Sequence, residues 1–328
     1  MAKTVSLILR VATAIAVLVV VGRTVDWAQL SRHLTLDFVI GVAATQPLII
    51  AGTVLLAWRY ARLISEPPPP LLAAFNGMVL SIGLNTLLPA RTAEVLKASY
   101  MCGRCGVALG IGLTAVVLER VLDAVFLGGL ALLAMAVLTP SPLWRGVLLA
   151  LVPIAMTLAL WLLLMLRRWA PALAVWLKAQ RWRIADGLLQ PALAHFQSHF
   201  SPNLLVWSTL ATLGAWLASA LSTGLFLFVA DGRLLDFTTL LTLVLALAIG
   251  AAVPIFPGGF VTFEGAGVLV LTGAGYDFDH ALALTVGIRL CLSVVIIPAS
   301  LVIFGRHGTG LGTLGHRIAE LWRKPAPQ

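Results

Sequence analysis

The chain has 328 residues, of which 60% are hydrophobic and only 11% are charged. Soluble globular domains carry about 25% charged residues, so this composition excludes an ordinary soluble protein. The net charge of +9 does not indicate nucleic-acid binding, because the basic residues lie in short stretches between apolar runs, as in loops beside anionic phospholipids. We therefore predict an all-α polytopic membrane protein with no nucleic-acid partner.

Apolar runs long enough to cross a bilayer predict about six spanning helices. The first run, 5–22, has the outline of a signal peptide. Arg23, Asp26 and Trp27 follow it without a small-residue cleavage site, so we expect a retained helix. The other five are expected at about 38–60, 107–138, 146–166, 203–230 and 280–305.

A polar stretch at 167–202 is basic, amphipathic and rich in tryptophan. This pattern is typical of a helix that lies on the cytoplasmic membrane surface and contacts anionic phospholipids. Positive charge favours the cytoplasm for this stretch and the C-terminal tail, and Lys3 and Arg10 favour it for the N-terminus. We expect one integral membrane domain over 1–328, in the bacterial inner membrane, with both termini cytoplasmic.

Two further apolar stretches do not fit a simple succession of spans. Arg59 and Arg62 place the end of the helix at 38–60 inside, and Arg104 favours the same side. The segment 71–104 would then enter and leave on one face, and 235–279 would do the same on the outer face. We predict two opposed re-entrant helical hairpins in addition to the six spans. If each hairpin is counted as one helix, the total is eight helices.

Each hairpin contains residues that break a helix. The first is expected to break at Pro89, and the second at Pro254 or at Pro257 with Gly258 and Gly259. Broken backbone at membrane depth is tolerated only where protein or a water-filled cavity surrounds it. These positions are therefore candidate hinges.

The two hairpin regions resemble each other in sequence. The spacing from Glu94 to Arg120 nearly equals the spacing from Glu264 to Arg289, and both units pass through a glycine-containing turn and a long apolar helix. Inverted repeats with discontinuous helices are a plan of secondary transporters. The predicted repeats are 38–138 and 203–305.

Several ionisable residues lie inside apolar segments, where each costs at least about 2.5–3.5 kcal/mol. Glu119 and Asp123 share a helix face and would repel each other unless a cation or a proton lies between them. One interpretation is a set of salt bridges that brace broken helices. The other is a polar cavity for a charged lipid headgroup, formed by Arg91, Glu94, Lys97, Glu119, Arg120, Asp123, Glu264 and Arg289.

No motif indicates a cofactor or a catalytic centre. Cys102 and Cys105 form a C-x-x-C without a second pair of ligands, so we predict no metal site. Asp277 and Asp279 form a D-x-D of the kind found in some glycosyltransferases, but in a short loop where a solvated turn explains it better. A P-loop is absent, which argues against ATP as the energy source.

Three motifs carry a resemblance to a known family. L-P-A-R-T-A-E-V-L-K (88–97), L-E-R-V-L-D (118–123) and P-G-G-F-V-T-F-E-G-A (257–266) with Ile288-Arg289-Leu290 look like the transmembrane region of the lysylphosphatidylglycerol synthase family. Ala90, Ala93 and Thr262 stand where glycines are common in those motifs. The resemblance extends over about 35–305.

The resemblance implies a lipid flippase or flippase-like protein. The synthase adds a soluble aminoacyl-transferase domain, and this chain ends at Gln328 without one, so translocation without synthesis is implied. We expect a transporter of a charged or glycosylated (phospho)lipid. Because Glu119 and Asp123 share a helix face, we also hypothesise that transport is coupled to proton movement. The alternatives are a membrane-embedded lipid-modifying enzyme or a scaffold for one, and a homo-oligomer or a lipid-synthesising partner enzyme is left open.

Overall fold

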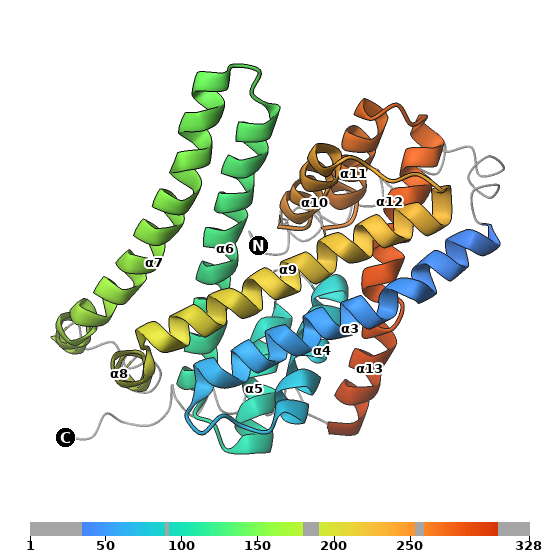
Figure 1. The fold of residues 1–328 in the computed structure, drawn as a ribbon. Coiled ribbons are helices and arrows are strands. Elements are labelled where there is room, and N and C mark those ends of the chain that lie inside the picture. The colour runs from blue at the N-terminus through green and yellow to red at the C-terminus, as the bar shows by residue number, and fades with distance from the viewer. Residues whose placement is uncertain (1–34, 89–91, 180–189, 253–258, 308–328) are drawn as a thin grey trace, which may run out of the picture. The chain divides into compact units, whose positions relative to one another are not determined.

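The computed structural model describes residues 35–88, 92–179, 190–252 and 259–307, and all regular elements in these ranges are α-helices (Figure 1). In chain order the helices are α3 (Leu36–Ile64), α4 (Leu71–Leu87), α5 (Thr92–Cys105), α6 (Leu109–Leu138), α7 (Pro142–Ala179), α8 (Gln190–His199), α9 (Pro202–Asp231), α10 (Phe237–Ala252), α11 (Thr262–Gly273), α12 (Phe278–Ser293) and α13 (Ile296–His307).

Within the described ranges, five helical segments are long and apolar enough to cross a membrane: Leu36–Ile64, Leu109–Leu138, Pro142–Trp169, Pro202–Asp231 and Phe278–Arg306. They correspond to five of the six predicted spans, and the sixth, 5–22, lies outside the described residues. The segment Pro142–Trp169 has a mean hydropathy of 2.6 in a window of which only 6% is buried. Apolar side chains exposed on this scale suit a lipid environment, so the prediction of an all-α polytopic membrane protein is confirmed.

Polar residues set the beginnings of several helices. Thr35 accepts a hydrogen bond from the backbone of Phe38 at the start of α3, and Ser201 does the same for Leu204 in α9. Asp236 accepts from the amides of Thr238 and Thr239 at the start of α10. Such N-caps satisfy amides that have no partner within the helix, and they fix where each apolar run begins.

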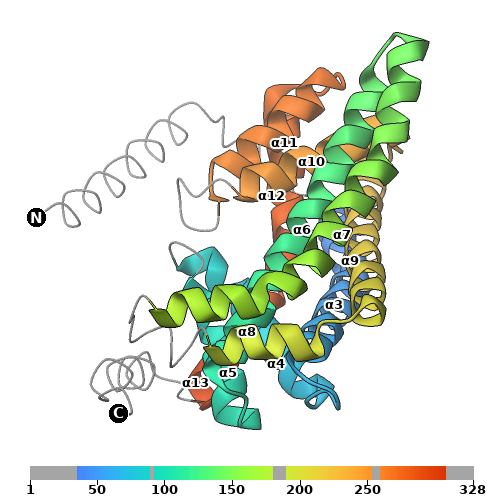
Figure 2. The same cartoon turned by 90° about the vertical axis from the view of Figure 1, so that its left-hand side faces the viewer.

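One helix continues past an expected boundary. The candidate span Pro142–Trp169 agrees with the span expected at about 146–166, but α7 continues to Ala179, into the segment expected to begin at 167. The pair Arg167-Arg168 changes the polarity without adding a glycine or proline, so nothing there ends the helix. Figure 2 shows that α7 changes direction along its length. A cytoplasmic surface position for 167–202 stays a prediction.

The helix expected at 280–305 is interrupted at Val294 and Val295, between α12 and α13. Pro298 explains the position of the break. Its ring has no N–H to donate to the carbonyl of residue 294 and would clash with that carbonyl in a continuous helix.

Both predicted hairpins consist of short helices. α4 has 17 residues and α5 has 14, while α10 has 16 and α11 has 12. Each is shorter than the roughly 20 residues that a straight span needs. α4 ends at Leu87 and α5 begins at Thr92, while α10 ends at Ala252 and α11 begins at Thr262. The predicted break positions Pro89, Pro254 and Pro257 lie outside the described residues. Entry and exit on one face, and the inverted repeat, stay predictions.

The chain divides into two compact units. Unit 1 comprises residues 1–50, 85–90 and 218–295. Its described part holds the beginning of α3, the end of α4, the end of α9, and α10 to α12. Its core includes Phe38, Phe226, Leu247, Phe263 and Ile288. The aromatic rings of Phe38 and Phe226 meet edge to face, with centroids 5.3 Å apart.

Unit 2 comprises residues 51–84, 91–217 and 296–328. Its described part holds the end of α3, most of α4, α5 to α8, the beginning of α9, and α13. α6 packs along α7, and α5 packs on α6 (Figure 2). Gly112 allows the second of these helix pairs to approach closely, because a Cβ at this position would lie 3.2 Å from that of Ala98.

Candidate functional site

The ionic network of unit 2 begins on α6, where Glu119, Arg120 and Asp123 lie within five consecutive positions. The side chain of Glu119 is completely buried, whereas that of Arg120 is 40% exposed and that of Asp123 is 21% exposed. α6 therefore presents one carboxylate to the interior of the unit and a cation to its surface.

Arg59 of α3 supplies the cation that the Glu119–Asp123 pair requires. Its Nη1 donates to Asp123 Oδ1 at 2.7 Å and to Thr212 Oγ1 of α9 at 2.6 Å, and its Nη2 lies 3.4 Å from Glu119 Oε1. The side chain is only 1% exposed. A planar guanidinium can contact two acceptors at once, which an ammonium group does less well. A cation therefore lies between the two carboxylates.

The position of Arg59 differs from the one expected on sequence grounds, which was the cytoplasmic end of its helix together with Arg62. In the structure α3 continues to Ile64, and only Arg62 is partly exposed. The signal that could have identified Arg59 is the repulsion between Glu119 and Asp123, which demands a buried cation. Thr212 carries no comparable signal, because α9 contains several small hydroxyl residues.

Lys97 of α5 provides a second cation for Glu119. Its Nζ donates to Glu119 Oε2, and it lies 4.1 Å from the centroid of the Tyr60 ring. Lys97 is buried, and so is Tyr60, whose hydroxyl lies 3.4 Å from the carbonyl oxygen of Gly112. A carboxylate partner and an aromatic face together replace the water that a buried ammonium group would lose.

Glu94 of α5 completes the network on the exposed side. Its Oε1 lies 3.6 Å from Arg120 Nε, while Arg120 Nη2 lies 3.2 Å from Asp123 Oδ2. The charges alternate in the order Lys97, Glu119, Arg59, Asp123, Arg120 and Glu94. Three cations and three carboxylates leave the network neutral, which is the condition under which so many charges can be buried.

A groove on the surface of unit 2 runs along this exposed end. Apart from Glu94 and Arg120, it is lined by Val116, Val117, Val121, Ala124 and Val125 of α6. The Nε atom of Arg120 is buried and makes no hydrogen bond within the described part of the chain, since its ion-pair partner Glu94 lies 3.6 Å away. The groove thus combines an aliphatic wall with one incompletely satisfied guanidinium.

A second ionic site lies in unit 1, between the start of α11 and the last part of α12. Arg289 Nε donates to Glu264 Oε1, and its Nη2 donates to Glu264 Oε2 and to the carbonyl oxygen of Gly259, both at 3.1 Å. The rings of Phe260 and Phe263 lie 4.6 and 4.3 Å from the guanidinium carbon. The site is a bidentate ion pair enclosed by aromatic rings.

The backbone at this second site is strained. Val261 has a φ of 74°, which is rare for a β-branched residue, and its amide donates to Glu264 Oε2 at 2.8 Å. Gly259, a predicted hinge, has a φ of 65°. Glu264 therefore holds both the start of α11 and Arg289, so a change in its hydrogen bonding would affect the broken helix directly.

A separate polar cluster closes the end of unit 1 where α9 ends and α12 begins. Asp231 accepts a hydrogen bond from the Tyr276 hydroxyl at 2.8 Å and lies 3.1 Å from His280 Nε2. Burial, followed by the contact with Asp231, raises the pKa of Tyr276 to about 12. The D-x-D beside it has a structural role at its first position, because Asp277 accepts from the backbone of His280 as the N-cap of α12.

The structure thus assigns the predicted site residues to two groups. Glu94, Lys97, Glu119, Arg120 and Asp123 come together in unit 2, and Glu264, Arg289 and Gly259 come together in unit 1. The other predicted positions, Pro89, Arg91, Pro257 and Gly258, lie outside the described residues. No group of three metal-binding side chains occurs among the residues with described positions.

Comparison with known proteins gives one match. The model of the family described as lysylphosphatidylglycerol synthase TM region matches residues 7–300. Neither the curated proteins nor the solved structures contain a significant match. The matched region includes both ionic sites and nearly all of the described spanning helices. The chain is a multi-pass membrane protein that belongs to the lysylphosphatidylglycerol synthase TM region family.

Proposed function

We propose that this protein moves a lipid with a charged or glycosylated phosphate-containing headgroup between the leaflets of the bacterial inner membrane. The observation that carries this proposal is the groove beside α6, in which Arg120 is the exposed end of a buried ionic network. A phosphate at Arg120 would accept hydrogen bonds from the guanidinium, and an acyl chain would lie along the valines.

The network explains how such a site could bind and release its ligand. Arg120 is shared between Glu94 and Asp123 at 3.6 and 3.2 Å, distances that leave room for a better acceptor. Asp123 keeps Arg59 as a partner when Arg120 turns to a ligand. Binding of an anion at Arg120 therefore leaves Asp123 paired with Arg59.

The second ionic site would serve the backbone rather than the ligand. Glu264 links Arg289 to the strained segment before α11, so its protonation or a change of partner would release the break between α10 and α11. Discontinuous helices are the elements that move or bind ligands in many transporters. The motive for proton coupling at Glu119 and Asp123 no longer holds, because Arg59 lies between them.

Reconstitution in liposomes tests the proposal. Labelled phosphatidylglycerol, a phospholipid with a glycosylated headgroup and phosphatidylcholine are compared, and the loss of label from the outer leaflet to a membrane-impermeant quencher is followed. Headgroup-dependent movement that Arg120→Gln reduces by about tenfold or more supports the proposal, because a charge-assisted hydrogen bond is lost. Glu264→Gln is expected to slow movement with any accepted lipid.

Arg145→Gln is the matched control, because it removes one positive charge from an exposed arginine at the start of α7. It should leave the rate unchanged. Equal loss in both arginine variants would mean that total charge, not the groove, sets the rate. No movement of any lipid, together with conversion of a lipid by an activated sugar or aminoacyl donor, would favour the enzyme alternative instead.

A further inference from the structure

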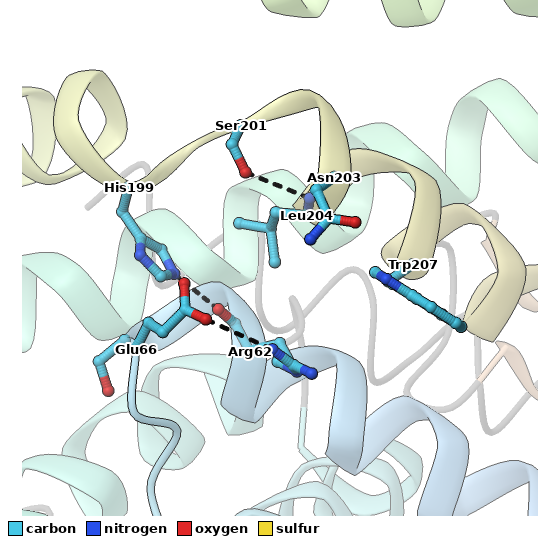
Figure 3. Close-up of a pocket in the computed structure, with 8 residues that line it drawn as sticks. Arg62, Glu66, His199, Ser201, Asn203, Leu204 and Trp207 are labelled. Atoms are coloured by element: carbon cyan, nitrogen blue, oxygen red, sulfur yellow. Dashed lines mark hydrogen bonds and ion pairs between the residues drawn. The ribbon is translucent and has the colours of Figure 1, made fainter.

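A second polar pocket lies in unit 2, where two spanning helices end. It is lined by Arg62, Ser65 and Glu66 at the end of α3 and by His199, Ser201, Asn203, Leu204 and Trp207 around the start of α9. Figure 3 shows that side chains from these segments surround one pocket. None of these residues belongs to the ionic network.

Most of the polar groups in this pocket are hydrogen-bond donors. Arg62 contributes a guanidinium, Trp207 an indole N–H, Asn203 an amide and Ser201 a hydroxyl. The single carboxylate is that of Glu66, which lies 3.8 Å from Arg62 Nη1 and is 76% exposed. An exposed pair at this distance is weak, so an incoming anion could replace Glu66 as the partner of Arg62.

The end of α3 would repel an anion if its carbonyls were bare, because the C-terminus of a helix carries partial negative charge. Two histidines of α8 cover them. His199 Nε2 lies 2.7 Å from the carbonyl oxygen of Arg62, and His195 Nε2 lies 3.1 Å from that of Leu63. The rings stack with centroids 4.8 Å apart. The pocket therefore presents the guanidinium of Arg62 and the start of α9, and the N-terminus of a helix carries partial positive charge.

The aromatic residues beside the pocket suit a position at the level of lipid headgroups. Trp58 packs edge to face on Trp207, with ring centroids 6.2 Å apart, and the guanidinium of Arg62 lies 5.3 Å from the Trp58 ring. Tryptophan and arginine gather where spanning helices leave the hydrocarbon. The contact with Trp58 also orients Arg62 toward one side of α3.

We propose that this pocket binds a phosphate anion, the group that phospholipid headgroups share with inorganic phosphate, through Arg62 and the donors at the start of α9. The site is separate from the groove at Arg120. It would hold an anionic lipid at the surface of unit 2, independently of which lipid the protein moves.

Titration calorimetry of the full chain in a non-ionic detergent tests the proposal. Short-chain phosphatidylglycerol and inorganic phosphate are the two probes. Binding of phosphatidylglycerol alone identifies a lipid site, and binding of both identifies a phosphate site that lipid can share. Arg62→Gln should weaken binding by about tenfold or more. Glu66→Gln should tighten binding, because it removes the competing carboxylate, whereas a purely structural role for the Arg62–Glu66 pair predicts no gain.

Arg145→Gln again provides the control for the loss of one charge, and Trp207→Phe keeps an aromatic ring while it removes the indole donor. The proposal is overturned if neither probe binds, or if Arg62→Gln and Arg145→Gln have equal effects on the affinity. It is also overturned if Arg62→Gln leaves the affinity unchanged, since the probe would then bind elsewhere, for example in the Arg120 groove. The measurement follows binding in detergent and not movement between leaflets. Its failure and the failure of the transport proposal can therefore be told apart.

Discussion

Replacement of Arg59 by methionine tests the ionic network most directly. Arg59 is 1% exposed and serves Asp123 at 2.7 Å, Glu119 at 3.4 Å and Thr212 at 2.6 Å. Its loss changes the charge of the network from neutral to −1. Removing one partner from a buried ion pair costs about 3–5 kcal/mol, because an uncompensated charge remains. We expect a decrease of that size in the free energy of unfolding, measured by denaturant titration in mixed micelles at pH 7.

A second substitution separates charge from packing. In Arg59→Met with Asp123→Asn the network is neutral again, so the double variant should regain much of the lost stability, and the two substitutions should be strongly non-additive. Arg59→Lys keeps the charge but cannot contact both carboxylates in the same way, and it should fall between the wild type and Arg59→Met. A single variant as stable as the wild type, or a double variant no better than the single one, would refute the reasoning.

Three further predictions concern packing and pH. Gly250→Ala should destabilise the α10–α11 hairpin by about 1–3 kcal/mol in thermal unfolding, since the new Cβ would lie 2.5 Å from the carbonyl oxygen of Thr262. Gly265→Ala is the control in the same assay, because a Cβ at that position would have no atom within 4 Å. Burial lowers the pKa of His195 below its ordinary 6.5, so the folded state binds this proton less well and stability should fall as the pH drops below 6.5; His195→Gln should flatten that part of the profile of melting temperature against pH. Tyr276, with a pKa raised to about 12, should stabilise the fold below pH 10 and lose this contribution between pH 10 and 12, and Tyr276→Phe should remove that alkaline decrease at a cost of about 1 kcal/mol.

The fold followed mainly from apolar run length. The span beginning near residue 38 was predictable, because a helix in lipid needs a minimum number of apolar residues. The continuation of α7 past Arg167 was not, since polarity changes there without a residue that ends a helix. The break before Pro298 was readable in principle from that proline alone.

The site was predictable in its residue types but not in its partners. The charges of α6 indicated a network, because ionisable residues inside an apolar helix must be paired. The identity of the partner Arg59 depends on how α3 packs against α6, which periodicity does not reveal. The sequence also could not show that the charged site residues divide between two units, because the predicted residues were counted together as one near-neutral group.

The Arg59–Asp123 contact has a consequence for biogenesis. Its partners are 64 positions apart in the chain, with two short helices between them. At a synthesis rate of about 5–20 residues per second, several seconds separate the emergence of Arg59 from that of α6. During that interval the guanidinium must reach the interface by extending along its own helix, since full burial alone would cost at least about 2.5–3.5 kcal/mol. We therefore expect α3 to reach its final depth in the membrane only after α6 has been inserted and Asp123 can pair with Arg59.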